Sequence, residues 1–356
     1  MKKNILFIGG SLNQTTMMHQ ISEHLSEHNC YFTPFYAESL IGLLTKIGLL
    51  NFTILGGQHR KNTEAYLAEH DLAVDFGGKE RDYDLVFTCT DTLIQKNIKG
   101  KRLILVQEGM TEPEGFLYQL VKRFRLPRYI ANTAATGLSD IYDLFCVASK
   151  GYRDLFIKKG VRPDKIAVTG IPNFDHVDSY HQNDFPHHDY VLAATSSNRE
   201  TLKLENREEF IRWVIEIAAG RKIIFKLHPN ENLKRASQEI KRLAPEALIL
   251  QKGNVNQMIA NCSVLVTQTS SVTFIGLAMG KEVHTYLDQA KLKKILPVQN
   301  GGTSSQRIAT LGRLLLNLNS DDLKALRSGK KDKLRWQSQK ALYLQRIAKV
   351  ERSRST

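Results

Sequence analysis

Short apolar runs alternate with longer amphipathic runs along most of the chain, and this alternation predicts strands separated by helices. In the first half, the expected strands are 4–8, 31–36, 51–55, 84–88, 102–106, 144–148 and 166–169. In the second half, the expected strands are 190–194, 222–227, 263–267 and 282–286. Strands joined through helices pair in parallel, so the pattern predicts an α/β fold.

Helical patterns follow most of these strands. The expected helices are 16–28, 39–50, 114–124, 149–159, 207–219, 232–243 and 272–279. Of these, 39–50 is apolar enough to be expected as a buried helix. The segment 174–189 is polar, contains proline and carries four histidines, which favours a linker. We therefore predict two Rossmann-like domains, 1–175 and 190–320, followed by a basic helical tail, 321–356.

The composition agrees with two domains that fold in water. A chain of 356 residues exceeds one ordinary core, and 42% hydrophobic with 24% charged residues is typical of globular proteins. The apolar run at the start is interrupted by Gly9 and Gly10, so it predicts a first strand and not a signal peptide. The four cysteines show no CxxC spacing, which argues against zinc and disulfides and for a reducing cytoplasm.

Positive charge is concentrated in two places. The formal net charge is +14, and the segment 321–356 carries half of it. A second cluster, Lys122, Arg123, Arg125 and Arg128, is interleaved with Leu120, Val121, Phe124 and Leu126. Nucleic acid, an anionic membrane surface and plain solvation are all compatible with such clusters. Taken alone, each cluster reads first as a solvated charged face, and because apolar residues separate the cations, an anionic membrane is favoured over nucleic acid as a partner.

Two strand ends in the second half carry groups suited to phosphate. His228-Pro229 follows the strand 222–227, and Ser270-Ser271 follows 263–267, where a helix is expected to begin. Ligands of parallel sheets bind at the carboxyl ends of strands, and backbone N–H groups at a helix start attract anions. Taken singly, the histidine reads as structural and the serines as helix caps. Their pairing in one sheet favours a phosphate site.

Each half also has a small-residue turn after its first strand. Gly9, Gly10 and Ser11 follow 4–8, and Ser196 and Ser197 follow 190–194. The first turn lacks the full GxGxxG spacing, so it indicates a Rossmann-like half more than a dinucleotide site. We expect Ser196 and Ser197 to join His228, Ser270 and Ser271 in binding the phosphates of a nucleotide. The turn of Gly9, Gly10 and Ser11 is expected to line the first domain's side of the site.

Together, Gln107-Glu108-Gly109, His228-Pro229 and Ser270-Ser271 resemble the motif set of bacterial inverting glycosyltransferases of the GT-B type. These include capsule and lipopolysaccharide sialyl- and Kdo-transferases and the related CDP-glycerol glycerophosphotransferases. The second half is also similar to UDP-N-acetylglucosamine 2-epimerases. The resemblance implies a GT-B fold, two Rossmann-like domains facing each other across a cleft. It also implies metal-independent transfer of a sugar or polyol phosphate from a nucleotide donor to a surface-glycan or lipid-linked acceptor.

The resemblance also implies roles for single residues. Its first motif supplies the general base, and because position 107 is glutamine, Glu108 takes that role, with Glu112 and Glu114 as reserves. His228, Ser270 and Ser271 would hold the donor phosphate, and no cofactor or metal beyond the nucleotide donor is implied. The enzyme would work in the cytoplasm, or peripherally on the inner face of the membrane.

Two other functions remain open at this stage. A UDP-N-acetylglucosamine 2-epimerase ranks lower, because Gly10-Ser11-Leu12-Asn13-Gln14 replaces that family's Gly-Thr-Arg-Pro-Glu-like motif. A non-catalytic nucleotide-sugar binder stays open because Gln107 stands where the transferases carry an acid.

Overall fold

The computed structural model describes residues 2–51, 53–196, 199–201 and 205–328. The described residues form two compact units. One unit contains the chain up to Asn173 together with the chain from Gly302 onwards, and the other contains Phe174–Gly301. Most of the expected basic tail, from 329 on, lies outside the described residues. No helix of the described part is long and apolar enough to cross a membrane.

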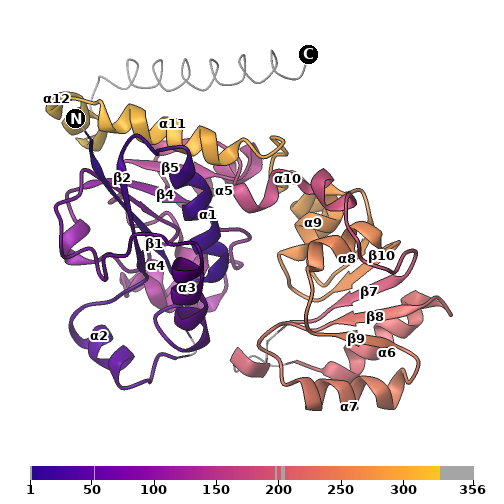
Figure 1. Ribbon diagram of the computed structural model, residues 1–356. Helices are drawn as coiled ribbons and strands as arrows, with labels where there is room; N and C mark the ends of the chain where they lie inside the picture. The colour runs from indigo at the N-terminus through magenta and orange to yellow at the C-terminus, as the bar shows by residue number, and fades with distance from the viewer. Residues whose placement is uncertain (1, 52, 197–198, 202–204, 329–356) are drawn as a thin grey trace, which may run out of the picture. The chain divides into compact units, whose positions relative to one another are not determined.

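The first unit is built on a six-stranded parallel sheet in the order β2-β1-β3-β4-β5-β6 (Figure 1). Its strands are β1 (Asn4–Gly9), β2 (Asn29–Pro34), β3 (Leu85–Thr88), β4 (Arg102–Val106), β5 (Leu144–Val147) and β6 (Ile166–Val168). Apolar runs without alternation produce such strands because both faces of a parallel sheet are covered. The rings of Phe7 and Phe87 stack in its core, 4.9 Å between centroids.

The helices of the first unit lie between or after these strands. They are α1 (Leu12–Glu23), α2 (Ser39–Lys46), α3 (Gly57–Glu69), α4 (Phe116–Phe124), α5 (Lys150–Lys159), α11 (Ser304–Leu316) and α12 (Ser320–Ser328). The expected strand 51–55 was wrong, because residues 53–56 form turns that lead into α3. The expected burial of the helix in 39–50 was also wrong, since no residue of α2 is buried. Its pattern predicted an apolar face, and nothing in the described residues covers that face.

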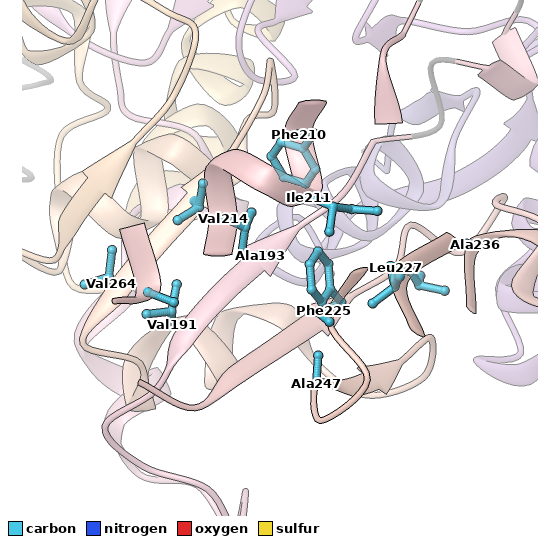
Figure 2. Close-up of a cluster of buried hydrophobic side chains, with 14 residues drawn as sticks. Val191, Ala193, Phe210, Ile211, Val214, Phe225, Leu227, Ala236, Ala247 and Val264 are labelled. Carbon is cyan, nitrogen blue, oxygen red and sulfur yellow. The ribbon is translucent and has the colours of Figure 1, made fainter. Parts of the chain in front are cut away.

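The second unit has a five-stranded parallel sheet in the order β11-β10-β7-β8-β9. Its strands are β7 (Val191–Ala194), β8 (Ile223–Lys226), β9 (Leu248–Leu250), β10 (Val264–Thr267) and β11 (Glu282–His284). Its helices are α6 (Arg207–Ala218), α7 (Leu233–Leu243), α8 (Val255–Asn261), α9 (Val272–Ala278) and α10 (Gln289–Ile295). Figure 2 shows Phe210, Ile211 and Val214 of α6 packed over Val191, Ala193 and Phe225.

The unit boundaries differ from the ranges expected from the sequence. The second unit ends at Gly301 and not at 320, because α11 packs against α1 and β4 of the first unit. Ser304 Oγ donates a hydrogen bond to the carbonyl oxygen of Thr169 at 3.0 Å. The approach is close at Gly312, where a Cβ would lie 2.9 Å from the ring of Phe87. The expected linker, 174–189, belongs to the second unit, where the side chains of Asn183 and Asn261 exchange hydrogen bonds.

Candidate functional site

In the second unit, the ring of His228 is held by its own turn. The backbone N–H of Asn230 donates to His228 Nδ1 at 3.2 Å. A nitrogen that accepts a hydrogen bond carries no proton, so the neutral ring keeps its proton on Nε2. The backbone N–H of His228 donates to Glu231 Oε2 at 2.8 Å, which fixes the start of the turn to its end. His228 therefore has a defined orientation and a defined N–H donor.

The His228 turn is bonded to a buried cluster of three charged side chains, Glu205, Arg207 and Glu231. Glu231 Oε1 accepts a hydrogen bond from Arg207 Nη2 at 2.5 Å, and Glu231 Oε2 accepts another from Thr195 Oγ1. Arg207 Nε lies 2.6 Å from Glu205 Oε1, and all three charged side chains are nearly inaccessible to solvent. Burial raises the pKa of Glu205, and Arg207 opposes that shift. The cluster thus ties α6 and the end of β7 to the His228 turn.

Strand order brings the other expected phosphate residues to the same edge of this sheet. β7 lies between β10 and β8, so the turns that follow these three strands are neighbours at their carboxyl ends. Ser196 Oγ donates to Gln268 Oε1 at 3.0 Å, which joins the turns after β7 and β10. Ser270 Oγ accepts from the N–H of Val272 at 3.4 Å, while Ser271 makes no side-chain capping bond. Ser197 lies outside the described residues.

A buried lysine completes this edge. Lys226 Nζ donates to the carbonyl oxygens of Leu227 at 3.0 Å and Gln251 at 2.8 Å. Burial lowers the pKa of Lys226, and the nearby Glu231 carboxylate opposes that shift. Gln251 Nε2 in turn donates to the carbonyl oxygen of Glu231 at 2.8 Å. The residue that follows β9 is therefore hydrogen-bonded to the His228 turn.

Sequence reasoning missed the residues that hold this turn, namely Thr195, Arg207, Lys226, Glu231, Gln251 and Gln268. Two of them did leave a signal in the sequence. Glu231 follows His228 by three residues in the same turn, and Lys226 interrupts an otherwise apolar strand. A charge in a buried strand must be paired or hydrogen-bonded, so it points to a polar site nearby.

In the first unit, Glu108 meets the turn of Gly9, Gly10 and Ser11. Glu108 Oε1 accepts from Ser11 Oγ at 3.0 Å and from Asn13 Nδ2 at 3.4 Å. Glu108 Oε2 accepts from Gln14 Nε2 at 2.6 Å. Ser11 is also the N-cap of α1, where its side chain accepts from the N–H of Gln14 at 3.2 Å. Glu108 and the Gly9–Ser11 turn, which were singled out from separate parts of the sequence, thus lie together at the carboxyl edge of this sheet.

The two glycines of this turn have a packing role. A Cβ at Gly9 would lie 2.6 Å from Thr15 Oγ1, and one at Gly10 would lie 2.8 Å from Ile54 Cδ1. The N–H of Gly10 donates to Gln14 Oε1 at 2.8 Å. Glycine is therefore required here for close approach of α1 and the 53–56 turns, whatever else the turn binds.

Gln107 occupies a different environment from Glu108. Its side chain is buried, Oε1 accepts from the N–H of Ala148 at 2.9 Å, and Nε2 donates to the carbonyl oxygen of Gly109 at 2.8 Å. The amide therefore bonds the end of β4 to the end of β5. A carboxylate at this position would set a negative oxygen against the Gly109 carbonyl, so the local structure favours glutamine here. The reserve residues Glu112 and Glu114 lie further along, between β4 and α4.

No protein-family model matches the chain, and no curated protein matches it. Solved structures match it at low identity. The S. aureus MnaA–UDP co-structure is 13% identical over 89% of this chain and 98% of its own, with a TM-score of 0.58. The UDP-GlcNAc 2-epimerase from Neisseria meningitidis bound to UDP-GlcNAc is 12% identical over 88% and 100%, with a TM-score of 0.55.

A third solved structure, the wall teichoic acid polymerase TagF with CDPG, is 12% identical over 88% of this chain and 89% of its own, with a TM-score of 0.50. All three likenesses extend over most of both chains, and they agree with the two parallel sheets described above. The expected fold class, α/β with two Rossmann-like domains as in GT-B proteins, is confirmed.

Proposed function

We propose that this protein is a metal-independent glycosyltransferase. It would move a sugar or polyol phosphate from a nucleotide-activated donor to a surface-glycan or lipid-linked acceptor. The fold supports a nucleotide-sugar ligand, because MnaA was solved with UDP and the Neisseria epimerase with UDP-GlcNAc. The polar turns at the carboxyl edges of both sheets lie where such folds bind their ligands.

The observation that carries the proposal is the fixed ring of His228. Its Nδ1 accepts from the Asn230 N–H, so Nε2 is the protonated nitrogen of the neutral ring. When the bond between the sugar and the donor phosphate breaks, negative charge builds on the departing nucleotide. An N–H group that is already held in place, here Nε2–H of His228, stabilises that charge without reorganising. Ser196, Ser197, Ser270 and Ser271 are assigned to the same phosphates.

Glu108 is the proposed general base. It would take the proton of the acceptor hydroxyl as the new bond to the donor group forms and the bond to the nucleotide phosphate breaks. Ser11 and Gln14 donate to different oxygens of the carboxylate, at 3.0 and 2.6 Å, and so hold its plane. An oriented carboxylate of this kind is what general base catalysis requires.

The decisive experiment compares two histidines of the second unit. His228→Ala should weaken nucleotide binding and slow transfer while the unit stays folded. His284→Ala is the matched control, because His284 is the last residue of β11 in the same sheet and pairs with Glu282 at 2.7 Å. A thermal-shift screen of CMP, CDP, UDP and GDP identifies the nucleotide first, since ligand at 100 times its Kd adds about 2.7 kcal/mol of stability. Parent-like binding by His228→Ala would remove His228 from the phosphate site.

A second experiment tests the base. Glu108→Gln keeps the shape of the side chain and removes its basicity, so turnover should fall by roughly 10²–10⁴ while donor binding persists. Glu112→Gln is the control and should retain turnover. If Glu108→Gln is fully active and Glu112→Gln is not, the base has been assigned to the wrong glutamate.

A UDP-N-acetylglucosamine 2-epimerase is the second candidate, because one of the matching structures is such an epimerase bound to UDP-GlcNAc. Epimerisation needs no acceptor and exchanges the proton on C2 of the sugar. Incubation with UDP-GlcNAc in D₂O therefore separates the candidates. Deuterium at C2 without any acceptor present would favour the epimerase, and nucleotide release that depends on an acceptor would favour the transferase.

A further inference from the structure

Helix α2 carries an apolar stripe that no described residue covers. Leu40 and Leu43 of α2 and Ile47, the residue directly after its last turn, are 68, 55 and 61% exposed. Their spacing of three and four residues puts them on one face of the helix. Leu49, just beyond the helix, is 61% exposed as well. Lone exposed leucines are common, whereas apolar side chains exposed together on one face are typical of binding surfaces.

Helix α4 has two apolar faces, and only one of them is covered. Tyr118 and Val121 are buried against three alanines of the following segment, Ala131, Ala134 and Ala135. The other face exposes Phe116, Leu117 and Phe124, which are 75, 54 and 61% accessible. The exposed apolar surface continues beyond the helix through Leu126, Tyr129 and Ile130.

Both helices lie at the carboxyl edge of the first unit's sheet, on either side of one loop. α2 follows β2, α4 follows β4, and the loop 89–98 follows β3 between them in the strand order. On the α2 side, the N–H of Lys96 donates to Glu38 Oε2 at 2.9 Å. On the α4 side, Arg128 Nη2 donates to the carbonyl oxygen of Asp91 at 3.5 Å. We call the exposed residues of 39–49 and of 116–130 the α2–α4 surface.

Cations stand among the apolar residues of this surface. Lys122, Arg123 and Arg125 are exposed, and none of them forms an ion pair with a carboxylate of the described chain. Arg123 lies 5.9 Å from the ring centre of Phe124, and Lys122 lies 5.9 Å from that of Tyr118. Long cationic side chains beside aromatic rings are typical of segments that rest at the boundary between headgroups and acyl chains.

We propose that the α2–α4 surface docks on an anionic lipid bilayer. The aliphatic side chains would enter the boundary of the acyl chains, and the unpaired cations would face the headgroup phosphates. A second copy of this chain fits less well, because a two-fold interface would set these cations against themselves. Nucleic acid fits less well too, because the exposed leucine, isoleucine and phenylalanine side chains that separate the cations bind no phosphate.

This inference deepens the proposed function and rests on it for one point only, the lipid-linked acceptor. Glu108 follows β4 at the same edge of the sheet, so a surface docked here would bring a membrane-held acceptor towards the proposed base. The docking itself requires no catalysis. It can therefore be measured apart from nucleotide binding and turnover.

The test uses the full chain and vesicles of phosphatidylcholine, with or without phosphatidylglycerol. Co-sedimentation should require phosphatidylglycerol and weaken as salt rises, because such attraction is screened within about 8 Å at physiological ionic strength. Lys122→Glu with Arg123→Glu should weaken binding at least about 25-fold, since each cation contributes about fivefold. Leu43→Gln with Ile47→Gln should weaken it too, and the residual binding of this variant should depend more steeply on salt.

Lys99→Glu with Lys158→Glu is the matched control. It makes the same change in charge at exposed positions near the opposite edge of the sheet, before β4 and β6. This control should bind vesicles as the parent does. The part of the basic tail from 329 on, which lies outside the described residues, stays unchanged in every variant. All variants should keep the nucleotide-induced thermal shift, so loss of docking and failure of the proposed function remain distinguishable.

Three results would overturn the proposal. One is equal binding to neutral and anionic vesicles, or no binding to either. Another is parent-like binding by both α2–α4 variants. The third is a different partner for the same surface: a change of oligomeric state by light scattering in the variants would identify a second copy, and loss of tight nucleic-acid binding would identify nucleic acid.

Discussion

Replacement of Glu231 by glutamine tests whether the buried charge cluster holds the His228 turn. The parent carboxylate accepts from the N–H of His228 and from Thr195 Oγ1 on one oxygen, and from Arg207 on the other. An amide has one accepting oxygen and one donating nitrogen. Whichever way the Glu231→Gln amide turns, its NH₂ group meets a donor, either Arg207 Nη2 or the His228 N–H.

The size of the effect follows from the burial of the cluster. The side chains of Glu231 and Arg207 are 1 and 4% exposed, so water cannot replace the lost partner. Removal of one member of a buried ion pair costs about 3–5 kcal/mol. Glu205 still pairs with Arg207 in the variant, so we expect the lower end, about 3 kcal/mol of the second unit's unfolding free energy.

The assay is urea unfolding followed through tryptophan fluorescence. The chain has two tryptophans, and Trp213 lies on α6 of the second unit, stacked on Tyr286 at 5.0 Å. A Trp336→Phe background leaves Trp213 as the reporter for this unit. For a slope near 2 kcal/mol/M, a loss of about 3 kcal/mol lowers the midpoint by about 1.5 M. Nucleotide binding, measured by thermal shift where the variant is still folded, should weaken as well.

Glu239→Gln is the control, because Glu239 pairs with Arg199 in the same unit at 2.8 Å but both side chains stay partly exposed. Exposed pairs contribute at most about 1 kcal/mol, so its midpoint should move by less than half as much. The reasoning fails if Glu231→Gln unfolds no earlier than Glu239→Gln. It fails in its functional part if Glu231→Gln is destabilised as expected and yet binds nucleotide like the parent.

Three further predictions follow from the first unit. Gln107→Glu should lower its unfolding free energy by about 1–3 kcal/mol in urea, because the Gly109 carbonyl loses its donor. The hydrogen bond from Arg313 lowers the pKa of Glu27 from 4.5 to about 2, so this pair stabilises the fold above pH 4.5 and stops doing so as pH falls towards 2. Glu27→Gln should therefore lower the free energy of unfolding, measured in urea, by under about 1 kcal/mol at neutral pH and by nothing below about pH 2. Burial raises the pKa of Cys30 to about 11, so a thiol reagent should label Cys30 slowly at neutral pH until urea unfolds the chain.

The strands and their parallel pairing could be predicted because buried parallel strands are short apolar runs, and each run here is followed by a helical pattern. Contacts between distant segments could not. Arg313 pairs with Glu27 across 286 positions, and no local pattern assigns α11 to the sheet that begins the chain. The same limit explains α2, since Leu40, Leu43 and Ile47 form a regular stripe whether a neighbouring element or a ligand covers it.

The positions of the candidate residues in the fold could be predicted from the sequence. His228, Ser196, Ser270 and Glu108 all lie in turns after strands, as their positions in the sequence indicated. The residues that orient them were not predictable in the same way. Arg207 and Gln268 come from separate turns, and the hydrogen bonds that join them to Glu231 and Ser196 depend on which strands are neighbours.

The two residues that follow β4 show why a glutamine at 107 is compatible with the proposed base at 108. Successive side chains leave an extended chain in opposite directions. Gln107 turns towards β5, where its amide needs both a donor and an acceptor, for the Gly109 carbonyl and the Ala148 N–H. Glu108 turns towards the start of α1, where Ser11 and Gln14 supply only donors, which a carboxylate satisfies and an amide does not. The surroundings of position 107 thus favour a neutral amide, and those of position 108 favour a carboxylate. A glutamine at the first position is therefore consistent with the proposal that Glu108 is the base.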